Sequence, residues 1–339
     1  MKAIVYDRPG SFAVREVPDP VPGPDEVLIR VLLAGVCGTD LHLHEGEFGP
    51  TYPLVPGHEV TGEVVGLGAG VTGLRPGQRV VLDNTSACGH CVECRRARPA
   101  FCRRAVARGV NAPGGFAELF VSPAANCLAV DDLPSDVAVF AEPTACVVHG
   151  LDMLGLRAGS DVLLFGAGPT GILLAQMLKR SGAARLTVAA PTQSKLDLLR
   201  SRGADEAVRI ERGAAAPHPR LRELAPDGFD VVVDATGALA VLEQTVGLTR
   251  TGGTVFVYGM TPETARWCVP SYEVFRRELT IKGSFAQQFS FDRSVAALRS
   301  GAVDTSGMIT DRFGLDEYAE ALRAVASSAT IKAVMVPNP

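Results

Sequence analysis

The sequence lacks the features of several protein classes. No apolar run reaches the roughly 20 residues of a membrane-spanning helix. The first ten residues predict a strand and a turn, without the apolar core of a signal peptide. The formal net charge of −4 provides no basic surface for nucleic acid. We therefore expect a cytoplasmic protein that binds neither a membrane nor a nucleic acid.

The length of 339 residues predicts two domains, and the texture of the sequence changes between them. Up to about residue 140, short β-branched runs alternate with turn signals such as "DPVPGPDE". From about residue 144, buried strands alternate with helices, as in "DVLLFGAGPTGILLAQMLKRSGA". This alternation is typical of a doubly wound parallel sheet, so the predicted class is α/β.

Four of the eight cysteines are clustered in one short loop. Cys88, Cys91, Cys94 and Cys102 have the spacing C-x2-C-x2-C-x7-C. In a reducing compartment, such clusters are ligands more often than disulfides. Four thiolates suit a closed tetrahedral zinc site, with an iron–sulfur cluster as the first rival. A closed shell leaves no position for substrate, so we expect a structural metal whose charge neighbouring arginines offset.

Three separate segments offer a second set of metal ligands. They are "GVCGTDLHLHEG" at 35–46, "PGHEVTGEVVG" at 56–66 and "FAEPTACVVHG" at 140–150. Each is weak evidence alone, because a single cysteine is usually a small core residue. Together they supply Cys37, His58 and a carboxylate, a mixed set that leaves one zinc position open for water or substrate.

A glycine-rich turn follows a buried strand and opens a helix. It contains Gly166, Gly168, Pro169, Thr170 and Gly171, with the glycines in the pattern G-x-G-x-x-G. In this context the pattern predicts a dinucleotide site. The first glycine makes the turn, the second admits the pyrophosphate, and the third lets the helix pack on the strand. The helix N-terminus then faces the phosphates.

The end of the next strand bears on the choice between NAD and NADP. NAD enzymes usually place an acidic residue there to bind the ribose hydroxyls. Ala190 stands at this position, followed by Thr192, Ser194 and Lys195, which offer hydroxyls and a cation to a 2′-phosphate. The sequence therefore favours NADP, with NAD or dual use as open alternatives.

These motifs, in this order and spacing, resemble the zinc-dependent medium-chain dehydrogenase/reductase family over essentially the whole chain. The shared marks are "CGTDLH", "GHE", the four-cysteine loop, "EP" at 142–143 and "GAGPTG". The resemblance implies a GroES-like, β-rich catalytic domain at 1–147 with both zinc sites. It also implies a Rossmann dinucleotide-binding domain at 148–283 and a return to the catalytic domain at 284–339.

The "EP" pair resembles the sorbitol and polyol dehydrogenase branch of the family. That likeness implies a catalytic zinc surrounded by Cys37, His58, Glu59 and Glu142, and leaves open which glutamate binds the metal directly. With the four-cysteine site, two zinc ions per chain are expected. A non-catalytic binding protein on this scaffold is disfavoured, because the zinc ligands and the glycine loop are all present.

The resemblance also implies how a proton leaves the site. An open zinc position would polarise the oxygen of an alcohol, and hydride transfer belongs to the nicotinamide. Thr39 is expected to take the alcohol proton, and the cofactor ribose and His42 to pass it to solvent, with His44 as a competing candidate. Asp40 is expected to orient the "CGTD" turn or to support the metal shell. Cys146 and His149 are interpreted as structural.

The substrate is the least determined feature. Phe48, Phe116 and Phe285 are candidate pocket walls, although each is also typical of a core residue. Gln287, in "KGSFAQQ", offers an amide to hydroxyl groups. We expect a polyol, a sugar alcohol or an (amino)cyclitol, with a threonine or simple secondary alcohol as the alternative. The family commonly forms homodimers or homotetramers, so a homo-oligomer is expected.

Overall fold

The structure is a computed structural model that describes residues 1–327 and 329–338. It divides into two compact units. The first comprises Met1–Ala145, Gln287–Gly301 and Thr305–Pro339, and the second comprises Cys146–Ala286 and Ala302–Asp304. The chain passes from the first unit to the second after residue 145 and back after residue 286, each within three residues of the expected boundaries at 147/148 and 283/284. The short return at 302–304 was not expected from the sequence.

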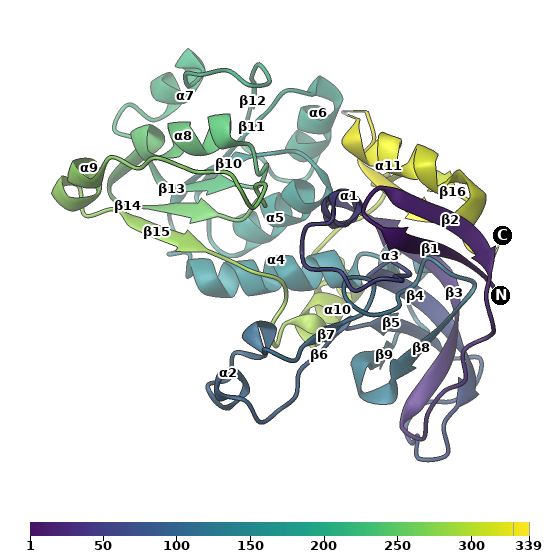
Figure 1. Cartoon of the computed structure of the whole chain (residues 1–339). Coiled ribbons are helices and arrows are strands. Elements are labelled where there is room, and N and C mark those ends of the chain that lie inside the picture. Colours follow the sequence, from purple (N-terminus) through teal and green to yellow (C-terminus); the bar gives the residue numbers. More distant parts are fainter. Residues whose placement is uncertain (328, 339) are drawn as a thin grey trace. The chain divides into compact units, whose positions relative to one another are not determined.

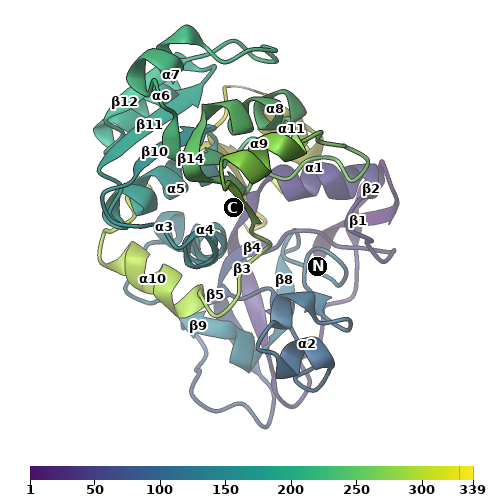
Figure 2. The same ribbon diagram turned by 90° about the vertical axis from the view of Figure 1, so that its left-hand side faces the viewer.

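The first unit is built on a seven-stranded sheet, of which Figure 2 shows β3, β4, β5 and β9 side by side. The strands run in the order β16 (Ile309–Phe313), β17 (Lys332–Met335), β3 (Glu26–Val36), β4 (Glu59–Leu67), β5 (Arg79–Leu82) and β9 (Cys127–Ala129), and β8 (Leu119–Pro123) also pairs with β3. Alternate residues of β3, including Val27, Ile29 and Val31, are fully buried. This period of two is what a strand with one face on the core requires.

Smaller elements complete the first unit. They are the antiparallel pair β1 (Lys2–Arg8) and β2 (Ser11–Glu16), the pair β6 (Thr85–Ser86) and β7 (Val106–Ala107), the helices α1 (Gly38–Glu45), α2 (Val92–Arg95), α3 (Ser135–Ala138), α10 (Phe291–Arg299) and α11 (Tyr318–Ala326), and the 3₁₀ turns η1 (Pro99–Phe101), η2 (Ala124–Asn126) and η3 (Leu315–Glu317). The main core gathers residues from the sheet, from β1 and from α11, including Tyr6, Phe116 and Tyr318.

The second unit is a six-stranded parallel sheet. Its order is β12 (Glu206–Arg209), β11 (Arg185–Ala190), β10 (Asp161–Phe165), β13 (Phe229–Asp234), β14 (Thr249–Val257) and β15 (Thr280–Gly283). The chain starts at β10 in the middle, builds outward on one side, and then crosses to the other. This order places a ligand crevice at the carboxyl ends of the central strands, and it confirms the predicted α/β class.

Helices cover both faces of this sheet. They are α5 (Pro169–Arg180), α6 (Gln193–Ser201), α7 (Pro219–Leu224), α8 (Leu239–Leu248) and α9 (Ser271–Arg276). Figure 1 shows α8 and α5 on opposite sides of the strands. One face packs Leu163, Phe165 and Val232 against α7 and α8. The sequences of β10 and β13 contain continuous apolar runs, because both faces of a parallel sheet are buried.

One stretch, Ser135–Leu154, has the length and hydropathy of a membrane span. It covers α3 and α4 (Ala141–Leu154), and 72% of its apolar window is buried inside the protein. A buried apolar helix is typical of a protein core, and this stretch is the one candidate found among the described residues. The first turn of α4 carries Glu142.

Candidate active site

Three of the predicted metal ligands lie together in the first unit. Cys37 follows β3, His58 precedes β4, and Glu59 is the first residue of β4. Antiparallel pairing of β3 with β4 sets Gly35 opposite Glu59, which brings these segments together. Ligand atoms of Cys37, His58 and Glu59 all lie within 4.8 Å of one another.

The turn after β3 is fixed by its own hydrogen bonds. Cys37 is the N-cap of α1, and its Sγ accepts the backbone N–H of Thr39 at 3.3 Å. Asp40 Oδ2 accepts the backbone N–H of Cys37 at 2.9 Å, which completes a capping box. Asp40 therefore orients the "CGTD" turn, as its position suggested.

The geometry of the cluster fits a zinc ion. Cys37 Sγ and His58 Nε2 are 3.2 Å apart, and a tetrahedral zinc would hold sulfur and nitrogen ligands roughly 3.5 Å apart. Burial lowers the pKa of His58, but negative charge on Cys37, Asp40 and Glu142 outweighs it and raises that pKa well above the ordinary value. The site thus carries an excess of negative charge that a divalent cation would neutralise.

Asp40 lies beside the ring nitrogen of His58 that does not face Cys37. Its Oδ1 lies 3.8 Å from His58 Nδ1, and both atoms are buried without a hydrogen-bond partner. Burial raises the pKa of Asp40 to about 6. A carboxylate beside the non-ligating nitrogen of a histidine orients the ring and makes it a better metal ligand.

Lys332 is a buried partner of the cluster that the sequence analysis did not identify. Its ammonium pairs with the carboxylate of Glu59, and the two side chains are 1% and 3% exposed. Burial lowers the pKa of Lys332, but the charges of Glu59 and Cys37 outweigh burial and raise it above the ordinary value. The available signal was a lysine inside the apolar strand "IKAVMVP".

Gly35 makes room for this ion pair. A Cβ atom at position 35 would lie 1.9 Å from Glu59 Oε2 and 2.8 Å from Lys332 Cε. Strand β17 pairs antiparallel with β3, with Val334 opposite Gly35, and this pairing delivers Lys332 to the cluster. Glycine is therefore required here by space, in a backbone conformation that other residues also adopt.

Glu142 acts on the cluster through its charge. It is 8% exposed, in the first turn of α4, and contributes to the raised pKa of His58. The set of mutually close ligand atoms among the described residues comprises Cys37, His58 and Glu59 and does not include Glu142. The geometry therefore favours Glu59 over Glu142 as the closer carboxylate.

The four predicted structural ligands form a second cluster, in the lobe that carries α2 (Figure 1). Sγ of Cys94 lies 3.5 Å from that of Cys91 and 4.0 Å from that of Cys88. These distances exceed a disulfide bond of about 2.05 Å and match the roughly 3.8 Å edge of a tetrahedral zinc–sulfur site. The backbone N–H of His90 is the main cause that lowers the pKa of Cys88 to about 5.

The arginines of this lobe differ in what they contact. Arg104 Nη2 lies 3.9 Å from Cys88 Sγ, where its charge offsets that of the thiolate as expected. Arg96 and Arg98 instead pair with Glu93, at 3.9 and 2.8 Å. The prediction that the arginines as a group neutralise the metal site was therefore too broad.

The glycine turn in the second unit fits a dinucleotide. Gly166 has φ +114°, and a Cβ on Gly171 would lie 2.4 Å from the Gly166 carbonyl oxygen. A Cβ on Gly168 would meet nothing within 4 Å, so the space above it is open. Gly168 is the N-cap of α5, whose N-terminal amides face an incoming phosphate in such turns.

Comparisons with known proteins support the zinc sites of the first unit and the dinucleotide site of the second. Family profiles match residues 23–132 (alcohol dehydrogenase GroES-like domain) and residues 169–300 (zinc-binding dehydrogenase). D-arabinitol dehydrogenase 1 of Uromyces fabae is 43% identical over 340 residues, covering 100% of this chain and 97% of the relative. The chain belongs to the zinc-dependent medium-chain dehydrogenase/reductase family.

Other relatives of this dehydrogenase differ in their substrates. D-altritol 5-dehydrogenase of Agrobacterium fabrum is 35% identical, covering 94% of both chains. L-threonine 3-dehydrogenase of Sinorhizobium medicae is 34% identical, covering 99% of this chain and 98% of the relative. Family membership makes the protein an NAD(P)-dependent oxidoreductase acting on an alcohol, and it favours zinc over an iron–sulfur cluster in the cysteine lobe.

Solved structures with the same fold carry either cofactor. A zinc-binding dehydrogenase of Sinorhizobium meliloti 1021, bound to NADP, superposes with a TM-score of 0.92 at 34% identity, covering 99% of both chains. An alcohol dehydrogenase of Escherichia coli, complexed with NADH, gives 0.90 at 27% identity, also covering 99% of both. The dehydrogenase thus has the family fold throughout.

The strand end that bears on cofactor choice is more basic than the sequence suggested. Ala190 ends β11, opposite Arg209 at the end of β12. Lys195 is 8% exposed in α6, and burial followed by the charge of Arg212 lowers its pKa. Arg212 was not among the residues predicted from the sequence. It follows β12, whose end pairs with the end of β11, and its charge acts on Lys195.

The predicted substrate residues have different surroundings. Phe116 is fully buried in the core beside Tyr318, at a ring distance of 5.3 Å, which favours the core alternative for it and removes it from the expected pocket wall. Phe285 is 48% exposed. Gln287 is 7% exposed, and its amide donates to Asn84 Oδ1 at 2.6 Å and Asp83 Oδ1 at 3.3 Å.

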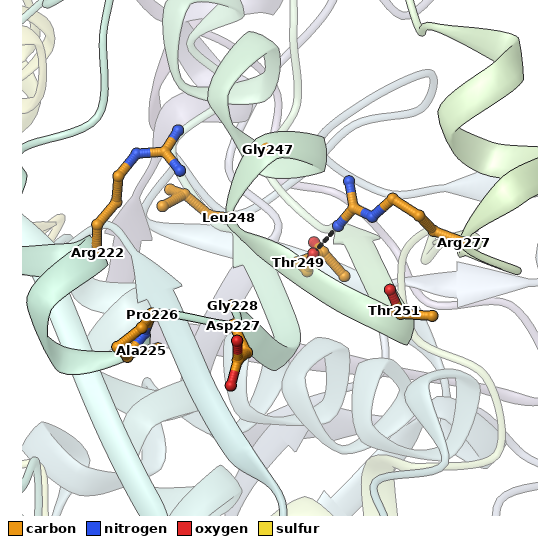
Figure 3. Close-up of a pocket in the computed structure, with 10 residues that line it drawn as sticks. All are labelled: Arg222, Ala225, Pro226, Asp227, Gly228, Gly247, Leu248, Thr249, Thr251 and Arg277. Atoms are coloured by element: carbon orange, nitrogen blue, oxygen red, sulfur yellow. Dashed lines mark hydrogen bonds between the residues drawn. The ribbon is translucent and has the colours of Figure 1, made fainter.

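Two cavities in the dehydrogenase lie away from these residues. One, of about 220 Å³, lies at the amino ends of β13 and β14 between Arg222 and Arg277 (Figure 3). Arg277 donates to the carbonyls of Val246 and Thr249 at the end of α8, so it caps a helix. The other, of about 280 Å³, is a largely apolar hollow beside β8.

Proposed function

We propose that this protein oxidises a secondary alcohol of a polyol, sugar alcohol or (amino)cyclitol, with NADP as the preferred hydride acceptor. The 43% identity to a D-arabinitol dehydrogenase over the whole chain carries the proposal. The open three-ligand set of Cys37, His58 and Glu59 supports it, because such a set leaves a position for substrate.

In this proposal Cys37, His58 and Glu59 hold the catalytic zinc, and Glu142 supports the site through its charge. Zinc bound there supplies a Lewis acid that polarises the substrate oxygen. The carboxylate of Asp40 lies 3.8 Å from His58 Nδ1 and adds negative charge beside the ring, and the ammonium of Lys332 holds the carboxylate of Glu59. The four cysteines hold a second, structural zinc.

The chain's own residues also move the proton. The hydroxyl of Thr39 both donates and accepts, so it takes the proton of the substrate hydroxyl. His42, one turn further along α1, passes that proton to solvent. We assign this role to His42; the ring of His44, the competing candidate, packs edge-on against Tyr6 and Phe12 in the first unit, at centroid distances of 5.8 and 6.0 Å.

The NADP preference rests on charge at the ends of β11 and β12. Ala190 presents no carboxylate to repel a 2′-phosphate, and Lys195 with Arg212 provides two positive charges. Thr192 and Ser194 add hydroxyl groups. Gly166, Gly168, Pro169, Thr170 and Gly171 hold the pyrophosphate.

The alternative substrate is L-threonine, because a threonine dehydrogenase is 34% identical over nearly the same span. We place it second, because the D-arabinitol and D-altritol enzymes are 43% and 35% identical. Phe48, Phe285 and Gln287 remain our proposed substrate contacts, with the Gln287 amide already held by Asn84 and Asp83.

A single assay panel tests both the substrate and the cofactor of the proposal. Zinc-loaded protein is mixed with D-arabinitol, D-altritol, a cyclitol, L-threonine and 2-propanol, each with NAD and with NADP, and reduction of the cofactor is followed by absorbance. We expect the highest kcat/KM for a polyol with NADP. Ala190→Asp should lower the NADP/NAD ratio about tenfold or more, since 1.4 kcal/mol of repulsion is a factor of ten. A wild-type preference for NAD would refute the cofactor assignment, and activity on 2-propanol alone would refute the polyol assignment.

We also propose a cytoplasmic homodimer or homotetramer. Strand β15 is the outer strand of its sheet. Ile281 in this strand is 40% exposed, and Tyr272 and Phe275 in the preceding helix α9 are 67% and 79% exposed. An apolar sheet edge of this kind favours pairing with a second copy. Light scattering should give a multiple of 35.6 kDa and Phe275→Glu a smaller species, whereas a wild-type monomer would overturn the assignment. None of the eight cysteines forms a disulfide in the structure, which agrees with a reducing compartment.

A further inference from the structure

The turn after α1 folds back on the helix that carries His42. Gly46 caps α1 in the left-handed conformation, with φ +87°. The backbone N–H of the next residue, Glu47, donates to the carbonyl oxygen of His42 at 2.9 Å. Glycine is the residue that adopts this conformation at least cost. The result is that the Glu47 side chain starts directly beside the last turn of α1.

The imidazole of His42 is held on two sides by this turn. Its Nδ1 contacts the carboxylate of Glu47, and the two side chains are 20% and 25% exposed. The ring of Phe48 stands nearly perpendicular to it, at 86° and a centroid distance of 6.2 Å. Phe48 has φ +70°, a conformation that costs a non-glycine residue free energy and that here aims its ring at His42.

The chemistry of this contact assigns the tautomer. A carboxylate accepts hydrogen bonds and donates none, so a neutral imidazole must carry its proton on Nδ1. Nε2 is then the nitrogen with the free lone pair. A relay residue needs that lone pair to receive a proton, and a fixed ring to receive it from one direction.

We propose that Glu47 is a positioning residue that sets the tautomer and ring orientation of His42 for proton transfer. This inference rests on the proposed function, in which His42 is the exit of the relay. Other charged neighbours are directed elsewhere. His44 bonds to Tyr6, Asp40 faces His58, and Glu45 is exposed on the same helix.

The first test reads the tautomer directly and needs neither substrate nor cofactor. Long-range ¹H–¹⁵N spectra of histidine-labelled protein, assigned with a His42→Ala sample, report which ring nitrogen is protonated in the neutral form. We expect Nδ1–H in the wild type and in Glu47→Gln, whose amide oxygen still accepts. Glu47→Ala should change His42 to the Nε2–H tautomer, and Glu45→Ala, the matched control, should not.

The second test measures turnover with D-arabinitol and NADP. Glu47→Ala is expected to lower kcat about tenfold with little change in KM, Glu47→Gln to recover most of the loss, and Glu45→Ala to match the wild type. An Nε2–H tautomer in the wild type, or equal kcat for Glu47→Ala and wild type, would overturn the role of Glu47 while leaving the polyol assignment intact. Wild-type turnover by His42→Ala would instead show that the relay itself is wrong.

Discussion

The buried pair of Lys332 and Glu59 yields the sharpest stability prediction. Both side chains are almost fully inaccessible, at 1% and 3% exposed. Removing one partner of such a pair leaves an uncompensated buried charge and costs about 3–5 kcal/mol. In a unit of roughly 150–250 residues, each kcal/mol lowers Tm by about 2–4 °C. We therefore expect Lys332→Met to lower Tm by roughly 6–20 °C.

The assay is thermal unfolding for the Tm and urea unfolding for the free energy, both followed by circular dichroism on zinc-free and zinc-loaded protein. Lys2→Met is the matched control, because Lys2 and Asp316 form a surface pair at 3.8 Å with side chains 48% and 75% exposed. Exposed pairs contribute about 0–1 kcal/mol. The double variant Glu59→Gln with Lys332→Met should be more stable than Lys332→Met alone, because the unpaired carboxylate is gone.

The result that refutes this reasoning is equally specific. If zinc-free Lys332→Met lies within about 1 kcal/mol of the wild type, the buried pair does not hold the cluster together. If the double variant is less stable than Lys332→Met alone, the cost does not come from an unpaired Glu59.

Three further predictions concern the same clusters. Gly35→Ala should cost about 1–3 kcal/mol or more through overpacking against Glu59 Oε2, 1.9 Å from the new Cβ, whereas Gly38→Ala, with nothing within 4 Å, should be near neutral in urea unfolding. Metal analysis should find two zinc ions per wild-type chain and one in Cys91→Ser, and two in Cys91→Ser would argue against the cysteine lobe as a zinc site. Because burial raises the folded-state pKa of Asp40 from 3.8 to about 6, its contribution to stability is fully present below pH 3.8 and lost as the pH rises through about 6. In zinc-free protein, the Tm of the wild type should therefore fall relative to Asp40→Asn over this range, and parallel pH profiles would contradict the prediction.

Local spacing allowed some features to be predicted and hid others. The four cysteines and the glycine turn are each contained in one short segment, so the sequence was enough to identify both. Lys332 was not predicted, because only the pairing of β17 with β3 brings it to Glu59. Arg212 was missed for the same reason, since the register of β12 with β11 brings it near Lys195. Glu47 was overlooked although it is local, because the left-handed turn at Gly46 is what directs it to His42.

The sequence by itself determined the family, the α/β class, the two metal clusters and the dinucleotide turn. These features are carried by residue types at fixed short spacings or by motifs in a fixed order. Only the tertiary structure decided which groups surround each ligand: that Glu59 is paired with Lys332, that Asp40 stands behind His58, and that Phe116 belongs to the core. The physical reason is that charge, burial and hydrogen-bond partners depend on strand register and chain crossings, which bring together residues from distant parts of the chain.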